Sequence, residues 1–254
     1  MTTHSSATDS ARPAREGSGA MFDDIAGRYD LLNRIISLGL DQSWRRKTVA
    51  SLDIQPGQRV LDLATGTADL ALRVAALADA IHVVGLDPSG NMLHIGQRKV
   101  IESQQSQRVQ LVRGDAQNLP FSEDSFDHVC MAFGIRNVPD RAKALREMAR
   151  ITRAGGHIAI LELAEPREGA LSSLARLHVH HVVPWLGSLL SGSREYRYLQ
   201  RSIAAFPPAA EFCQTMEQSG LRMLRCEPMT MGVATLYVAT PNKGAPSDDR
   251  EPRH

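Results

Sequence analysis

The stretch RVLDLATGTADL at residues 59–70 decides the fold, because an apolar strand runs there directly into a turn of small residues. A second strand-like segment ends at Asp87, about 20 positions beyond Gly66. An acidic residue at that spacing accepts hydrogen bonds from the two hydroxyls of a ribose. The turn lacks the third glycine of a G-x-G-x-x-G fingerprint, and no GK[ST] phosphate loop follows. The pattern predicts a site for an adenosine-like ligand without a pyrophosphate, and S-adenosylmethionine is the candidate.

Composition narrows the class of protein. A chain of 254 residues that is 43% hydrophobic can bury one large core, and its 29 basic and 28 acidic residues create no overall field for nucleic acid. The three cysteines form no CxxC pair of the kind that binds zinc. No segment approaches the roughly 20 apolar residues of a membrane span. We expect a cytoplasmic protein that binds neither metal nor nucleic acid, with at most peripheral contact at the inner face of a membrane.

The two ends differ from the rest of the chain. Residues 1–20 are rich in Ser, Ala, Thr and Pro, and residues 242–254 are polar, so neither end buries enough apolar surface to offset its ordering entropy. We expect both ends to be disordered and a single domain to occupy residues 21–241.

Strand-like and helical patterns alternate through this domain. Strands are predicted at 59–64, 81–87, 109–115, 126–133 and 157–163. Apolar residues at three- and four-residue spacing predict helices at 68–78, 89–104 and 140–152. Two last strands, 221–229 and 232–240, are joined by a short connection as in a hairpin. The alternation predicts an α/β fold with a mostly parallel seven-stranded sheet, helices on both faces and a C-terminal antiparallel hairpin, the Rossmann-like layout of class I S-adenosylmethionine-dependent methyltransferases.

Ligands of such sheets bind outside the carboxyl ends of the strands, which selects the cofactor residues. The small residues around Gly66 let backbone amides approach the methionine part, and Asp62 or Asp69 would face its ammonium group. Asp87 would accept from the ribose hydroxyls. At the end of the third strand, Asp115 would accept from the adenine amine, and the amide of the next residue, Ala116, would meet a ring nitrogen.

Each of these features has a simpler structural interpretation. The small-residue turn occurs as an ordinary tight loop in many α/β proteins. Asp87 alone could be an acid that favours the start of the following helix. The three features together, at the ends of three successive strands, favour nucleoside binding.

Longer segments resemble the ubiquinone/menaquinone biosynthesis C-methyltransferase family, of the demethylmenaquinone methyltransferase type. The specific parts are YDLLN at 29–33, FGIRNV at 133–138 and YRYLQRSI at 196–203, whereas methyltransferases in general share only the cofactor motifs. The resemblance implies methyl transfer from S-adenosylmethionine to a ring carbon of a prenylated quinol. It assigns cofactor binding to Thr67, Asp87, Asp115 and Ala116.

The chain departs from the family pattern at two positions near the cofactor. Ala68 stands where the family often has Gly, which limits backbone freedom at the turn. Ala132, a further expected cofactor contact, stands where many members have Ser, so one side-chain hydrogen bond is missing. The second departure leaves open whether the acceptor is a naphthoquinol, a benzoquinol or both.

The expected substrate residues lie in three segments. Residues 21–47 are a candidate helical lid in which Tyr29 and Asn33 offer polar tips, while the aliphatic members of its stripe would pack on the sheet edge. Arg136 and Asn137 follow the fourth strand, where an arginine could orient a quinol oxygen through its fork of donors or could instead pair with Asp140.

The third segment is an insert at 167–205 whose apolar content suits an isoprenoid tail. Its closely spaced histidines lack the i, i+4 spacing of a zinc helix. A proton acceptor could come from His181, Tyr196 or Tyr198.

Two other functions remain open at this stage. One is a class I methyltransferase acting on another small acceptor, and the other is a noncatalytic cofactor-binding subunit of a quinone-synthesis complex. The sequence leaves the oligomeric state undecided, a homodimer included.

Overall fold

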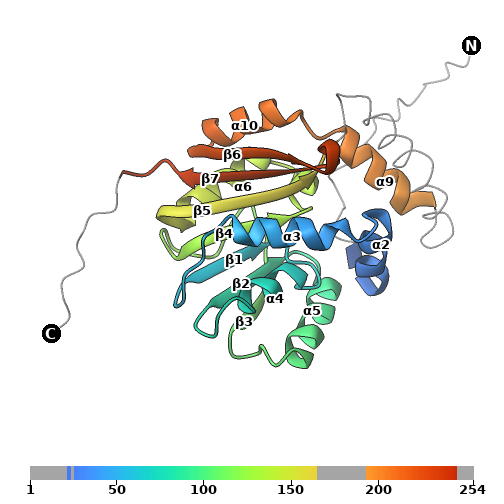
Figure 1. Ribbon diagram of the computed structural model, residues 1–254, viewed down its shortest axis with the longest axis horizontal. Coiled ribbons are helices and arrows are strands. Elements are labelled where there is room, and N and C mark those ends of the chain that lie inside the picture. Colours follow the sequence, from blue (N-terminus) through green and yellow to red (C-terminus); the bar gives the residue numbers. More distant parts are fainter. Residues whose placement is uncertain (1–21, 24–25, 165–192, 245–254) are drawn as a thin grey trace, which may run out of the picture.

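The computed structural model describes residues 22–23, 26–164 and 193–244, whose seven strands form one sheet with helices on both faces (Figure 1). The strands are β1 Arg59–Leu63, β2 His82–Asp87, β3 Val109–Arg113, β4 Phe126–Ala132, β5 Thr152–Leu163, β6 Leu221–Met229 and β7 Ala234–Pro241. Their order is β3-β2-β1-β4-β5-β7-β6. β1 to β5 pair in parallel, and β7 runs antiparallel to both β5 and β6. The predicted α/β methyltransferase fold is confirmed.

Helices connect the strands and precede the sheet. Their bounds are η1 Ala26–Arg28, α2 Tyr29–Ile36, α3 Leu40–Ala50, α4 Asp69–Ala75, α5 Gly90–Glu102, η2 Ile135–Asn137, α6 Arg141–Ile151, α9 Ser193–Ala204, α10 Ala209–Gln218 and η4 Thr230–Gly232. α4, α5 and α6 each lie between two neighbouring parallel strands and return the chain from the end of one strand to the start of the next, as crossover connections do.

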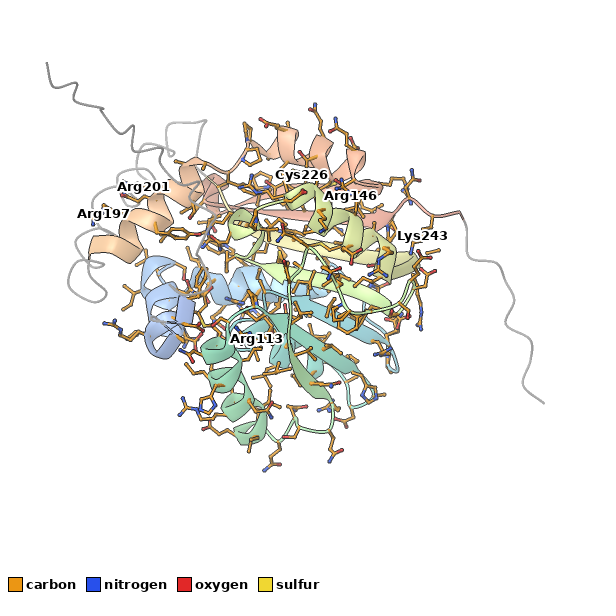
Figure 2. All side chains as sticks on the ribbon, turned by 180° about the vertical axis from the view of Figure 1, so that it is seen from behind. Arg113, Arg146, Arg197, Arg201, Cys226 and Lys243 are labelled. Carbon is orange, nitrogen blue, oxygen red and sulfur yellow. The ribbon has the colours of Figure 1, made fainter. Side chains whose placement is uncertain are left out.

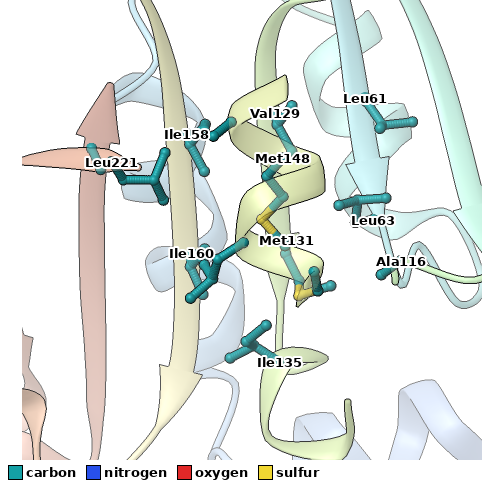
Figure 3. Close-up of a cluster of buried hydrophobic side chains, with 14 of the residues drawn as sticks. Leu61, Leu63, Ala116, Val129, Met131, Ile135, Met148, Ile158, Ile160 and Leu221 are labelled. Atoms are coloured by element: carbon teal, nitrogen blue, oxygen red, sulfur yellow. The ribbon is translucent and has the colours of Figure 1, made fainter. Parts of the chain in front are cut away.

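Strand alternation divides the core into two apolar layers. In β1, Leu61 and Leu63 pack on the face covered by α6 and α10 (Figure 3), while Val60 packs on the face covered by α3 and α4. Because successive side chains of a strand point to opposite faces, both faces are apolar and the strands read as continuous hydrophobic runs.

β5 begins at Thr152, earlier than the predicted start at residue 157. Gly155 and Gly156 lie within β5, but Gly155 has a φ of 79°, a left-handed conformation that interrupts the extended strand. The register with β4 shifts at this point, and a Cβ on Gly156 would lie 2.1 Å from the backbone oxygen of Asp127. The glycine pair therefore permits a close strand approach at an irregularity.

The chain makes ordered contacts beyond Pro241. The N–H of Asn242 donates to the Gly220 carbonyl, and Lys243 Nζ donates to the carbonyls of Arg150 and Thr152. Residues 1–20 and 245–254, for which we predicted disorder, lie outside the described residues. No helix in the described ranges is long and apolar enough to cross a bilayer.

Candidate cofactor and substrate site

A cavity opens at the carboxyl ends of β1, β2 and β4, where the strand order reverses because β1 pairs with both β2 and β4. Such a switch point is the general ligand position in open α/β sheets. Its lining includes six of the residues selected from the sequence: Tyr29, Gly66, Asp87, Asp115, Ala116 and Asn137. Ala64 beside the predicted turn and Phe133, Gly134 and Val138 of the FGIRNV motif also line it, whereas Met131 and Pro139 were not singled out from the sequence.

Asp87 is buried at the end of β2 and is held by two backbone amides. Its Oδ2 accepts from the N–H of Gly66 at 2.9 Å and its Oδ1 from the N–H of Ser89 at 2.8 Å. Burial raises the pKa of the carboxyl, and the two amide hydrogen bonds oppose that rise. Ser89, and not Asp87, caps α5 by accepting from the N–H of Met92. Each carboxylate oxygen keeps a lone pair that can accept a hydroxyl donor.

The turn after β1 depends on left-handed backbone conformations. Ala64, Gly66 and Ala68 have φ angles of 50°, 56° and 67°. Only glycine adopts this region without a steric cost, so two alanines here store strain in the turn. The departure noted at Ala68 therefore falls on a left-handed residue that is fully buried beneath the turn.

Asp62 is buried below the same turn and does not line the cavity. Its Oδ2 accepts from the Thr65 hydroxyl at 2.6 Å, and the Cys130 thiol lies 3.7 Å from Oδ1. Burial raises the pKa of Asp62 to about 7, against the lowering effects of Thr65 and of the positive charge of Arg45. The carboxyl of Asp62 therefore holds the turn in place through its hydrogen bond with Thr65 and does not contact a ligand in the cavity.

Thr67 and Asp69 also point away from the cavity lining and join a cluster with the N-terminal segment. Lys99 Nζ lies 2.5 Å from Asp30 Oδ2 and 2.6 Å from Asp69 Oδ1. The Thr67 hydroxyl donates to Asp30 Oδ1 at 2.6 Å. Asp69, one of the two acids expected to face the ammonium group, is instead engaged by Lys99.

The N-terminal segment forms one wall of the cavity. Asp23 accepts from the Ser89 hydroxyl and from the N–H of Asn91, and the ring of Phe22 packs edge-on against that of Tyr29 at 6.0 Å. These contacts attach Asp23 to the start of α5, and the hydrogen bond between Thr67 and Asp30 attaches α2 to the turn before α4. Asp30 belongs to the YDLLN motif but was not selected from the sequence, and its bond to Thr67 gives the motif a structural role at the cofactor turn.

The residues at β3 and β4 occupy different positions relative to the cavity. Asp115 and Ala116 line it, and Asp115 Oδ1 accepts from the N–H of Gln117 at 2.9 Å. Ala132 is buried in the layer covered by α3 and α4 and is absent from the lining. The next two residues, Phe133 and Gly134, reach the cavity instead. Phe133 has a φ of 60°, and a Cβ on Gly134 would lie 2.5 Å from that of Ala64.

Arg136 is buried in an ion pair with Glu162, and the expected alternative pairing with Asp140 is wrong. Arg136 Nη1 lies 2.6 Å from Glu162 Oε1, and the backbone N–H of Arg136 donates to Oε2 at 3.0 Å. Asp140 caps α6 by accepting from the N–H of Lys143. No local pattern marks Glu162, which lies within an apolar strand 26 residues away.

The guanidinium of Arg136 lies close to two phenols. Burial lowers its pKa, but Glu162 and then Tyr29 and Tyr198 outweigh burial and raise it above its ordinary value. Its Nε has no hydrogen-bond partner in the described part of the chain. Arg136 does not line the cavity, so its contribution to a ligand would be a charge behind Tyr29 and Asn137.

Asn137 connects the cavity to α9. The Tyr198 hydroxyl donates to Asn137 Oδ1 at 3.0 Å, which directs the amide NH₂ of Asn137 away from α9. Because Tyr198 donates its hydroxyl proton to Asn137, we interpret Tyr198 as a residue that orients the Asn137 amide. Tyr196 begins the YRYLQRSI motif within α9, but its side chain lies outside the described residues, as does all of His181.

The cavity suits an adenosine-type ligand chemically. It combines a carboxylate with free acceptor capacity, a glycine at the turn, and the apolar side chains of Leu86 and Met92. The seven-stranded sheet with its antiparallel end and this site together define a class I S-adenosylmethionine-dependent methyltransferase.

Comparison with known proteins identifies the family. The chain belongs to the ubiE/COQ5 methyltransferase family, whose model matches residues 10–241. It is 41% identical over 85% of its length to the ubiquinone/menaquinone biosynthesis C-methyltransferase UbiE of Geotalea daltonii, covering 93% of that protein. It is 38% identical over 86% of its length to the demethylmenaquinone methyltransferase of Bacillus cereus strain B4264, covering 92% of it.

Solved structures support the fold alone. The [4+2]-cyclase SpnF superposes with a TM-score of 0.68 at 19% identity, over 92% of this chain and 98% of its own. The putative methyltransferase in complex with the Haloferax volcanii Trm112 activator gives 0.63 at 19% identity, over 87% and 98%. The name of the first neighbour shows that this fold also carries a cyclase, so the activity has to be argued from the site.

Proposed function

We propose that this methyltransferase transfers the methyl group of S-adenosylmethionine to a ring carbon of a prenylated quinol, and that its first substrate candidate is demethylmenaquinol. The observation that carries the proposal is the meeting of Tyr29, Asn137 and the charge of Arg136 beside the cofactor cavity. All three belong to the segments that distinguish the quinone-pathway relatives from other methyltransferases. The two curated relatives named above carry quinone methylation in their names.

Within this proposal, Asp87 binds the ribose and Asp115 with Ala116 binds the adenine. The bound cofactor supplies an electrophilic methyl group on a sulfonium. Thr67 and Asp62 act indirectly, since Thr67 holds Asp30 and Asp62 holds Thr65 behind the turn. Ala132 contributes only through the neighbouring Phe133 and Gly134.

On the acceptor side, the guanidinium of Arg136 favours a phenolate at the quinol ring, an effect that its ion pair with Glu162 reduces. A phenolate places electron density on the ring carbon beside it, which is the atom to be methylated. Asn137, oriented by Tyr198, donates to a quinol oxygen, and Tyr29 closes the cavity from the N-terminal side. We propose that residues 21–47 act as the lid of one domain that spans 21–241. A proton acceptor from Tyr196 or His181 remains part of the proposal.

A methyl-transfer assay tests the acceptor. The full-length protein, labelled S-adenosylmethionine and a demethylated naphthoquinol should give labelled naphthoquinol, and a parallel reaction should contain the demethylated benzoquinol. Label in the first alone assigns the protein to menaquinone synthesis, and label in both assigns it to both pathways. Label in neither lipid, with cofactor binding intact, would refute the proposal.

Replacing Asp87 with alanine should raise the dissociation constant of S-adenosylmethionine roughly ten- to a hundredfold. The reason is the loss of charge-assisted hydrogen bonds worth about 1.5–3 kcal/mol. Calorimetric titration measures the constant. Asp79→Ala is the matched control, because Asp79 is fully exposed and pairs only with Arg108. An unchanged constant in Asp87→Ala would remove Asp87 from the site.

A further inference from the structure

Exposed apolar side chains gather at the end of the molecule where the cavity opens. Of the seven large apolar side chains exposed in the described residues, Leu31 lies in α2, Leu38 in the turn after it, Leu40 at the start of α3 and Met231 in η4. Leu31 is 55% exposed and Leu38 is 64% exposed. α2 contributes Tyr29 to the cavity, and η4 joins β6 to the start of β7, which pairs with the carboxyl end of β5.

These side chains lie on one connected surface. Trp44 Nε1 of α3 donates to the Thr230 hydroxyl at 2.9 Å, so α3 is fixed to η4 beside Met231. Two other exposed side chains lie away from the cavity. Leu77 follows the C-terminal end of α4 and Ile101 lies near the C-terminal end of α5, where the chain returns to the amino ends of the strands. Exposed apolar residues that cluster around a cavity mouth mark an interaction site more often than scattered ones do.

Positive charge surrounds the same surface. Arg34 is exposed three residues after Leu31 on α2, and Arg197 and Arg201 are exposed on α9. Figures 1 and 2 place α9 at the same end of the molecule as α2, and Figure 2 labels Arg197 and Arg201 of α9. The acids Asp23 and Asp30 of the N-terminal segment are bound to Ser89 and Lys99. Among the described side chains of this surface, the exposed charges are therefore mainly positive, although the chain as a whole has a formal charge of only +1.

We propose that this surface, formed by Leu31, Arg34, Leu38, Leu40, Arg197, Arg201 and Met231, docks on a bilayer that contains anionic phospholipid. Leucine side chains enter the boundary between headgroups and acyl chains, and arginines bind the phosphates. The cavity then opens at the membrane surface, where a quinol ring can enter while its isoprenoid tail stays in the lipid. The physiological meaning of the surface rests on the proposed quinol substrate, but lipid binding itself does not.

Vesicle binding tests the surface directly. The full-length protein should sediment with vesicles of phosphatidylcholine that contain about a third phosphatidylglycerol, and less so at high salt. Leu31→Ser with Arg34→Gln should lower the partition coefficient about tenfold or more, because an inserted leucine and a surface arginine are lost together. The matched control is Ile101→Ser with Arg98→Gln, since Ile101 is 59% exposed and Arg98 precedes it by three residues on α5. The control should bind like the wild type.

Three results would overturn the docking surface. They are a wild-type protein that does not bind anionic vesicles, equal losses in the two variants, and a vesicle-free dimer that Leu31→Ser with Arg34→Gln dissociates. The last result would assign the surface to a second copy of the chain.

Methyl transfer to a tail-free quinol in buffer separates this proposal from the proposed function. A Met231→Ser variant, which changes the surface outside the proposed lid, should keep the wild-type rate there and lose part of its activity on a long-tailed quinol in vesicles. Absence of transfer by the wild type in both assays would count against the quinol substrate, whereas vesicle binding would still report on the surface.

Discussion

Replacing Glu162 with alanine should lower the free energy of unfolding by about 3–5 kcal/mol, because it leaves the buried charge of Arg136 without its partner. The two side chains are 6% and 0% exposed, and the ion pair is 2.6 Å long. Glu162 also accepts from the backbone N–H groups of Arg136 and Leu163, so the loop that carries FGIRNV loses its anchor. Chemical denaturation followed by circular dichroism measures the change.

Two further variants separate the buried charge from the loss of a contact. Glu227→Ala removes a partly exposed partner of Lys47 and should cost at most about 1 kcal/mol. Glu162→Gln combined with Arg136→Met should recover part of the stability, because the buried charge is removed and the amide oxygen of glutamine can still accept from a backbone N–H. A cost for Glu162→Ala no larger than that of Glu227→Ala would contradict the buried ion pair.

Replacing Asp62 with asparagine should stabilise the ligand-free protein increasingly as the pH rises from about 4 to 8, by on the order of 3–4 kcal/mol in all. Burial raises the pKa of Asp62 from 3.8 to about 7 in the folded protein. Between these values the folded state keeps a proton that the unfolded state releases. The stability that this carboxyl contributes is therefore lost as the pH rises through the window, and asparagine does not titrate.

The measurement has to compare variant and wild type at each pH. Burial lowers the pKa of His128 to about 4, so the stability due to neutral His128 is lost as the pH falls from about 6.5. In this pH window the His128 contribution to the free energy of unfolding rises with pH, whereas the Asp62 contribution falls. The two together flatten the dependence of wild-type stability on pH. The difference between Asp62→Asn and wild type cancels the His128 contribution. A difference that does not change with pH would show that Asp62 titrates normally.

The fold could be predicted because strands and helices follow from the local spacing of apolar residues. Alternation and run length predicted seven strands near their observed positions. The clearest difference is the start of β5, which lies at Thr152 and not at residue 157, because an irregular stretch with a register shift precedes the regular pairing with β4. Asp87 could be found because it follows its strand at a fixed distance from the turn after β1. Glu162 and Lys99 carry no such local signal, although each controls part of the site.

By itself the sequence determined the α/β fold, the edge of the sheet at which a ligand binds and the acid that ends β2. These follow from apolar periodicity and chain order, which depend on residues close together in the chain. Only the tertiary structure decided that Arg136 pairs with Glu162, that Lys99 joins Asp30 to Asp69, and that Tyr198 orients Asn137. The first pairing depends on β4 and β5 lying side by side, and the other two depend on how α2 and α9 pack beside the sheet, so these side chains from distant segments meet only in the folded chain.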